Sequence, residues 1–152
     1  MLGWSRFGPC WLLMLAGSMV GVGCGEVERP ELTVFPVSGS IQVDGKPPVG
    51  AEIRCRPSQP LKDPAHRSIE PFAFVERDGT FKIGTYLGDD GAPPGEYSLT
   101  IVWPVITVEG GEEVRGADRL KGRFAKPDQP IARITVQPDE ETYIPEIVLR
   151  TR

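Results

Sequence analysis

The feature that most constrains this fold is a period of two in the side chains, which runs through most of the sequence after residue 33. Apolar and polar residues alternate in 37–43, in 97–103 and in 131–136. Successive side chains of a strand point to opposite faces, so this pattern is typical of strands with one buried face. No segment after residue 33 has a convincing helical period. The sequence therefore predicts an all-β domain.

Glycine and proline divide the alternating segments into short strands. The chain has 18 Gly and 16 Pro, spread along its length, and no Asn, so Asp-Gly and Pro-Gly must supply the tight turns. The segment ERDGTF, residues 76–81, predicts a hairpin between a strand with Phe72 and Phe74 and one with Phe81 and Ile83.

About seven short strands separated by turns favour an antiparallel seven-stranded β-sandwich, in which inward Val, Ile, Leu and Phe form the core. Residues 104–130, charged and rich in Gly, are expected to form the longest irregular connection. Cys55 lies on the same side of its strand as Ala51 and Ile53, which predicts that it faces the core.

The first residues differ from the rest of the chain. Arg6 is the only charge among the first 25 residues, and an apolar run follows from Cys10 to Val22. This run of about 13 residues is too short to span a bilayer and matches the apolar part of a secretion signal. The sequence therefore divides into a signal peptide at 1–23, a tether at 24–35 and a β-sandwich domain at 36–150.

The end of the signal segment resembles a bacterial lipobox, in which a cysteine becomes the acylated first residue of the mature protein. Gly21 and Gly23 precede Cys24, and polar residues follow it. The departure is Gly21, at a position where lipoboxes prefer Leu. The resemblance implies export to the cell envelope and lipid anchoring at Cys24, where each buried methylene contributes about 0.8 kcal/mol.

Ordinary signal cleavage is the alternative, because Gly21 and Gly23 also fit the small-x-small pattern of a cleavage site. It would release a soluble periplasmic or secreted protein. Cys24 could then form a disulfide with Cys55 instead of carrying lipid.

Three segments resemble one known family in order. They are VSGSIQVDGKPPVGAEIRCRP, ERDGTFKIGTYLGDDGAPPGEYSLTIVWP and DRLKGRFAKPDQPIARITVQPDE. Together they look like small bacterial lipoproteins with a carboxypeptidase-regulatory-like, transthyretin-like domain, and the likeness covers about residues 36–149. It implies a transthyretin/prealbumin-like sandwich, and such domains mostly have no assigned activity. The matching residues are Gly39, Asp44, Gly45, Pro47, Gly50, Ala51, Pro57, Asp78, Gly79, Phe81, Thr85, Asp90, Gly91, Ala92, Pro93, Gly95, Glu96 and Tyr97.

The segment GDDGAPPGEY, residues 88–97, is the most site-like stretch, and we interpret it as a turn that precedes a strand. Tyr97 is expected to pack its ring and bond its hydroxyl back to a turn, as in a tyrosine corner. The alternative is a Ca²⁺ site at Asp89 and Asp90, although their spacing is not that of an EF-hand.

No catalytic set is apparent in the sequence. His66 is the only histidine, and the chain contains no GxSxG, P-loop or CxxC motif. One enzyme with a transthyretin-like fold, a hydrolase of purine breakdown, needs several His and Arg residues and a Tyr-Arg-Gly-Ser tail. This chain has one His and ends in VLRTR, which argues against that activity. We therefore expect no enzymatic activity, metal or cofactor. The net charge of -4 gives no basic surface for nucleic acid.

The sequence favours a non-catalytic envelope lipoprotein that binds or scaffolds another envelope protein or a polysaccharide. One alternative is a carbohydrate-binding module in which Trp103 and Tyr86 form an aromatic platform. Against this, Trp103 shares a face with Leu99 and Ile101, which favours its burial. A hydrolase that uses residues 104–130 and His66 is a third hypothesis.

Overall fold

A computed structural model describes residues 31–151, which form strands and loops without a helix. No helix in this range is therefore of a length and hydropathy that could cross a bilayer. The signal segment, Cys24 and the tether up to residue 30 lie outside the described residues. The strands are β1 (Val37–Val43), β2 (Glu52–Pro57), β3 (Phe72–Phe74), β4 (Thr80–Lys82), β5 (Gly95–Val102), β6 (Pro104–Glu109), β7 (Glu112–Asp118), β8 (Ala132–Val136) and β9 (Thr142–Leu149).

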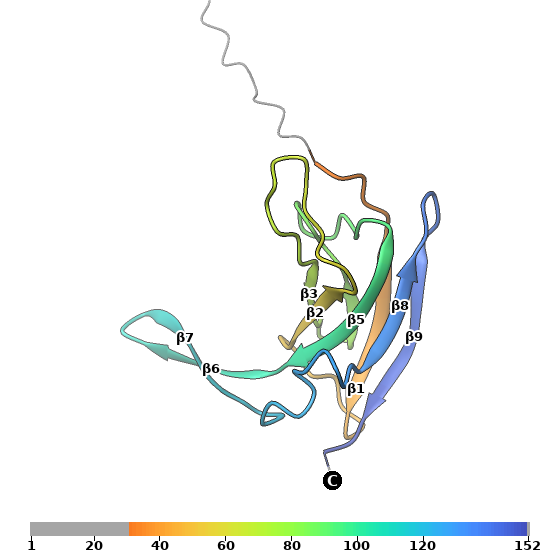
Figure 1. The fold of residues 1–152 in the computed structure, drawn as a ribbon. Coiled ribbons are helices and arrows are strands. Elements are labelled where there is room, and N and C mark those ends of the chain that lie inside the picture. The colour runs from red at the N-terminus through yellow and green to blue at the C-terminus, as the bar shows by residue number, and fades with distance from the viewer. Residues whose placement is uncertain (1–30, 152) are drawn as a thin grey trace, which may run out of the picture.

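Two larger sheets face each other across one core, so the predicted β-sandwich architecture is present (Figure 1). One sheet has the order β4-β1-β9, and the other has the order β3-β2-β5-β8. The structure corrects two details of the prediction. The described residues form nine strands instead of seven, and β1 pairs with β9 in parallel, whereas the prediction was fully antiparallel.

The core is formed by the inward positions that the alternation indicates. In β1 these are Val37, Ile41 and Val43, and all three are buried. In and just before β2, Cys55 is completely buried together with Ala51 and Ile53, which confirms the predicted orientation. Burying a large aliphatic side chain contributes roughly 1.5–3 kcal/mol, so this shared core holds the two sheets together.

The β6–β7 hairpin, residues 104–118, projects from the sandwich and is here called the arm (Figure 1). The prediction of an irregular connection over 104–130 was therefore wrong for its first half. Gly110 and Gly111 join the strands with φ angles of 62° and 89°, as a tight two-residue hairpin turn requires. Apolar side chains of the arm remain exposed, namely Ile106, Val108 and Val114.

Asp118 fixes the base of the arm. Its carboxylate accepts hydrogen bonds from the backbone N–H groups of Trp103, Leu120 and Gly122, at 2.9, 3.0 and 2.7 Å. The Arg119 N–H also donates to the Trp103 carbonyl at 2.8 Å. The arm therefore starts from a closed junction beside the end of β5.

The turn at 76–79 forms as predicted, but the strands on either side of it join different sheets. Gly79 has a φ of 88°, and the Asp78 carboxylate accepts hydrogen bonds from the N–H and hydroxyl of Thr80. β3 then pairs with β2, whereas β4 pairs with β1. An isolated bridge joins Phe72 of β3 to Gly84, which follows β4. The predicted hairpin is thus opened into a connection between sheets.

Residues 31–35 and the arm lie at opposite ends of the sandwich. Phe35 forms a backbone bridge with Ala92, just before β5 begins at Gly95. β5 then spans the sheet and continues through Trp103 into the arm. Eight strand residues rise about 26 Å in total at roughly 3.3 Å each, which separates the two ends by the length of the sandwich.

Candidate functional site

Two phenylalanine side chains form an exposed ridge on β3, here called the aromatic ridge. Phe72 is 44% exposed and Phe74 is 53% exposed. Their ring centroids lie 5.7 Å apart with an interplanar angle of 81°, an edge-to-face contact. Ala73 between them is buried and opposite Ile53 in register, so β3 turns its alanine inward. The strand itself was predicted, whereas the orientation of its two phenylalanines was not.

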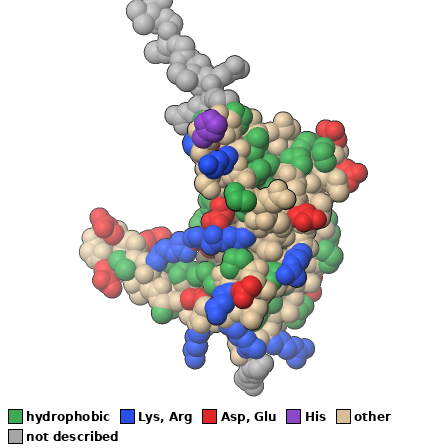
Figure 2. Space-filling view, viewed as in Figure 1, with side chains coloured by type: hydrophobic (Ala, Val, Ile, Leu, Met, Phe, Trp, Pro, Cys, Tyr) green, Lys and Arg blue, Asp and Glu red, His purple; other side chains and the backbone are tan. Residues whose placement is uncertain are grey.

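A hollow of about 370 Å³ lies beside the aromatic ridge and is here called the arginine hollow. Besides the two phenylalanines, its lining is Glu52, Arg54, Glu70 and Arg115. Figure 2 shows blue Lys and Arg side chains along the concave surface between the arm and the body of the domain. Arg115 comes from β7, so the arm supplies one wall of this hollow.

Glu52 organises the arginine hollow. Its buried carboxylate accepts a hydrogen bond from Arg54 Nε at 2.5 Å on one oxygen and from Arg115 Nη2 at 2.6 Å on the other. Burial acts to raise the pKa of Glu52, but the hydrogen bonds and charges of Arg115 and Arg54 outweigh it and hold the pKa below the ordinary 4.5. Glu52 is therefore ionised at neutral pH and fixes two guanidinium groups.

The arginines of this hollow still face solvent. The side chain of Arg54 is 40% exposed and that of Arg115 is 51% exposed. Glu70 forms an ion pair with Arg56 and a longer one, 3.7 Å, with Arg54. The cluster of three arginines and two glutamates thus carries one excess positive charge in a chain whose net charge is negative.

A second hollow of about 290 Å³ contains Tyr86 and is here called the Tyr86 hollow. The aromatic ridge lines it too, and its polar residues include Lys82, Glu76 and Asp89. β2 pairs along one edge of β3, while Gly84 bridges the other edge, so the two hollows flank the ridge on opposite sides. The predicted ligand residue Tyr86 therefore belongs to the ridge surface, and its hydroxyl accepts a hydrogen bond from the Leu32 N–H at 3.0 Å.

Trp103, the other predicted ligand residue, lies elsewhere. It follows β5 at the end where Val102 pairs with Glu52, whereas Tyr86 lies past Gly84 at the opposite end of β3. The Trp103 indole N–H donates to the Val49 carbonyl at 3.1 Å, and the Arg119 guanidinium lies 5.0 Å from the centre of its ring. The structure does not bring Trp103 and Tyr86 into one aromatic platform.

The loop before β5 is held by its own side chains, which supports the interpretation of residues 88–97 as a turn. The Asp90 carboxylate accepts hydrogen bonds from the N–H groups of Thr85, Tyr86 and Leu87, at 2.6, 3.0 and 2.9 Å. The buried Tyr97 hydroxyl donates to the Pro93 carbonyl at 2.7 Å, which confirms the predicted tyrosine corner. Within residues 31–151, no three His, Cys, Asp or Glu side chains are grouped as metal ligands.

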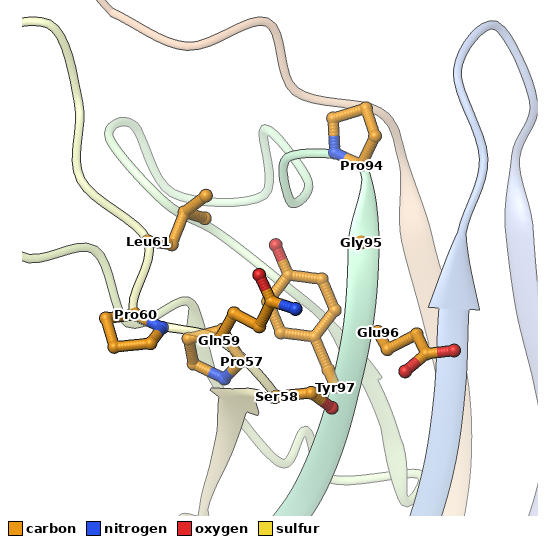
Figure 3. A pocket seen from close by; sticks show the side chains of 9 residues that line it. All are labelled: Pro57, Ser58, Gln59, Pro60, Leu61, Pro94, Gly95, Glu96 and Tyr97. Carbon is orange, nitrogen blue, oxygen red and sulfur yellow. The ribbon is translucent and has the colours of Figure 1, made fainter.

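Another hollow, of about 340 Å³, lies between the start of the 57–71 loop and the start of β5 (Figure 3). Leu61, Pro60 and the Tyr97 ring contribute much of its lining. Figure 3 shows that Glu96 points to the other side of β5 from the Tyr97 ring. Since the Tyr97 hydroxyl is already bonded to Pro93, this hollow offers a ligand mainly apolar surface and few polar groups.

Cys55 and His66 do not form a reactive pair. The free Cys55 thiol is completely buried, and burial, assisted by the charge of Glu70, raises its pKa to about 12. His66 is exposed in the 57–71 loop, where the nearby Asp63 carboxylate is paired with Arg67 at 2.5 Å. The thiol is thus protonated at neutral pH and shielded from solvent.

The sequence interpretation missed Phe72, Phe74, Arg54 and Arg115 as functional candidates. Arg54 alternates with Ile53 and Cys55 and so belongs to the outward side of its strand, but nothing in β2 alone indicates that an arm will supply Arg115 next to it. One signal was present in the sequence: VITVEGGEEVR has two strand-like segments separated by Gly110-Gly111, a strong hairpin pattern.

Comparisons with known proteins leave the family open. No family model matches the chain, and no curated protein matches it in sequence. Similar solved structures include a 9R-lipoxygenase from Cyanothece, which is 13% identical with a TM-score of 0.40. The similar region covers 77% of this chain and 16% of the lipoxygenase. A protein from Pseudomonas aeruginosa described as a candidate carbohydrate-binding protein is 11% identical, with a TM-score of 0.40. The similar region covers 79% of this chain and 90% of that protein. The chain thus spans less than a fifth of the lipoxygenase, and neither likeness is close enough to carry a function.

Proposed function

We propose that this protein is an exported, lipid-anchored component of the cell envelope whose transthyretin-like β-sandwich is a non-catalytic binding domain. The signal-like segment and Cys24 with its preceding glycines support the anchor. The resemblance of residues 36–149 to small bacterial lipoproteins supports the same assignment. The partner is another envelope component, either a protein or a polysaccharide.

The observation that carries the proposal is the separation of the two ends of the sandwich. The chain enters beside Ala92, and the arm leaves β5 at the other end. A tether of 24–35 reaches at most about 40 Å when fully extended. A lipid at Cys24 would therefore hold the entry end near the membrane and direct the arm away from it.

Two further observations support a binding role in preference to catalysis. The only thiol among residues 31–151 is protonated and buried, so it is a poor nucleophile. Arg115 of the arm and Arg54 of β2 are instead fixed by Glu52 at a partly exposed surface, and arginine is enriched at protein interfaces.

Acylation of Cys24 is the direct test of the anchor. Cells that express the wild type, Cys24→Ala or Cys55→Ala are labelled with a fatty-acid analogue and fractionated. We expect the wild type and the matched control Cys55→Ala to be labelled and membrane-bound, and Cys24→Ala to be unlabelled and soluble. Membrane retention of unlabelled Cys24→Ala would contradict the proposal.

A second candidate function, a carbohydrate-binding module, is favoured by one observation. The aromatic ridge exposes two rings between two hollows with polar walls. Exposed aromatic side chains next to polar groups are a common arrangement for ligand sites. Retardation of the purified protein in native gels that contain polysaccharide tests this function, and migration unaffected by any polysaccharide would refute it.

A further inference from the structure

We propose that the aromatic ridge and its two flanking hollows bind a linear polysaccharide that carries carboxylate groups. Sugar rings stack on Phe72 and Phe74, and a carboxylate is held in the arginine hollow by Arg54 and Arg115. This inference rests on the second function proposed above and adds the ligand class, the contact residues and the direction in which the chain crosses the domain.

The shape of the surface indicates an extended ligand. The hollows measure about 290 and 370 Å³, close to the lower limit of about 300 Å³ for sites that enclose a small molecule. They share Phe72 and Phe74, so a single ligand that crosses the ridge reaches both. A chain of sugar units has this form, with neighbouring units on either side of the ridge.

The two rings indicate what crosses the ridge. Phe72 and Phe74 are about half exposed and their side chains carry no polar atom, so covering them with an apolar surface is favourable. The C–H face of a sugar ring is an apolar, flat surface that covers an aromatic ring while its hydroxyl groups stay free to bond at the sides. Lys82 and Thr85 are polar residues of the Tyr86 hollow that can receive those hydroxyl groups.

An added peptide strand fits this surface less well. A peptide that extends a sheet needs an open edge with unpaired backbone groups. β3 has only three residues, pairs with β2 on one side and is bridged to Gly84 on the other. The Phe72 N–H already donates to the Gly84 carbonyl. The ridge therefore offers a ligand side chains more than free backbone groups.

The charge of the arginine hollow indicates an acidic ligand. Glu52 uses one oxygen for Arg54 and the other for Arg115, and each guanidinium group has five N–H donors. The planar fork of an arginine matches a carboxylate with two parallel hydrogen bonds. The charged lining of the arginine hollow is balanced, and Arg56 beside it, which pairs with Glu70, adds one positive charge. The Tyr86 hollow, with one lysine against Glu76 and Asp89, is net negative, so the acidic group belongs on the arginine side.

The test uses the full mature chain as Cys24→Ala, purified without lipid, in native gels that contain polygalacturonate. Highly methyl-esterified polygalacturonate is the matched ligand control, because it has the same backbone with its carboxylates masked. We expect retardation by polygalacturonate, an apparent affinity at least about tenfold lower for the ester, and weaker binding at high salt.

Variants locate the site. We expect Phe72→Ala/Phe74→Ala to abolish retardation by both polymers. Arg54→Gln/Arg115→Gln is expected to lower only the affinity for polygalacturonate, by about tenfold. Arg77→Gln and Leu87→Ala change exposed residues outside the ridge and are the matched controls. Unfolding midpoints in urea show that each variant is folded.

Each outcome separates the proposals. Equal binding to the acid and the ester overturns the acidic ligand but keeps carbohydrate binding. Retardation that survives the phenylalanine variant overturns the assignment of the site. If no polysaccharide, acidic or neutral, retards the protein, both the inference and the carbohydrate-binding function fail, while the lipid anchor is still decided by the acylation experiment.

Discussion

β3 and β4 flank a single turn and share one burial pattern, exposed–buried–exposed, yet their aromatic residues lie in opposite environments. Phe72 and Phe74 of β3 are exposed, whereas Phe81 of β4 and Ile83 just after it are completely buried. The difference comes from the partners. β3 joins β2 with Ala73 opposite Ile53, whereas β4 joins β1 with Phe81 opposite Gly39. Alternation defines two faces of a strand, and the register with its neighbour decides which face is buried.

The largest contrast should come from truncating one phenylalanine in each strand. Phe81→Ala removes a fully buried ring and is expected to lower the free energy of unfolding by about 3–5 kcal/mol. Phe74→Ala should change it by less than about 1 kcal/mol, because the ring is half exposed. Urea unfolding followed by tryptophan fluorescence measures both. Equal losses would show that Phe74 is a core residue.

The next effect concerns Glu52, the buried charge beside the exposed ridge. Glu52→Gln weakens two hydrogen bonds to arginines and should cost about 1.5–3 kcal/mol at pH 7. Because folding lowers the pKa of Glu52, its contribution is present above the ordinary value of 4.5 and is lost as the pH falls below it.

The stability difference between wild type and Glu52→Gln should therefore be constant at pH 6–7 and shrink in acid below about 4.5. Glu141→Gln, an exposed change of the same charge, is the control. A difference that grows as the pH falls would reverse the assigned sign.

A substitution at Gly39 tests whether the missing side chain there is what allows Phe81 to be buried. A Cβ on Gly39 would lie 2.7 Å from Phe81 Cζ and 2.9 Å from Ile144 Cβ, so β1 leaves room for the ring of β4 only with glycine there. We expect Gly39→Ala to destabilise by about 1–3 kcal/mol. The double variant with Phe81→Leu should recover part of that loss. Additive losses in the double variant would indicate that the ring is not the obstacle.

The smallest effect is expected for polar replacement of the ridge. Phe72→Ser/Phe74→Ser should leave the free energy of unfolding within about 1 kcal/mol of the wild type, since neither ring is part of the buried core. It should also reduce binding of a hydrophobic dye such as ANS to the native protein. Unchanged dye binding would place the exposed apolar surface elsewhere, for example on the arm.

Local patterns predicted what depends on neighbours in sequence. The inward side of β1, the burial of Cys55 and the hydroxyl bond of Tyr97 all follow from alternation and turn residues within a few positions. The face of β3 did not follow, because it depends on pairing with β2 across a loop of 14 residues, 58–71.

The candidate site was only partly predictable for the same reason. Tyr86 was identified as a ligand residue in one alternative, together with Trp103, but its neighbours Phe72 and Phe74 were interpreted only as strand residues. Arg115 reaches Glu52 from 63 positions away through an arm that was taken for an irregular loop. Contacts at this range have no signature in a single short segment.

The parallel pairing of β1 with β9 joins strands more than a hundred residues apart in sequence. β9 lies at the sheet edge with β1 as its only partner there, so this side of β1 stays unpaired until Thr142–Leu149 has been made. If the chain is exported from its first residue, as proposed, the earliest strand to emerge must wait for the latest. Closing so long a loop is slow, and the interval would expose β1 to proteases and to pairing with other chains. Under the proposed export, folding of this domain would thus wait until its last strand has been delivered.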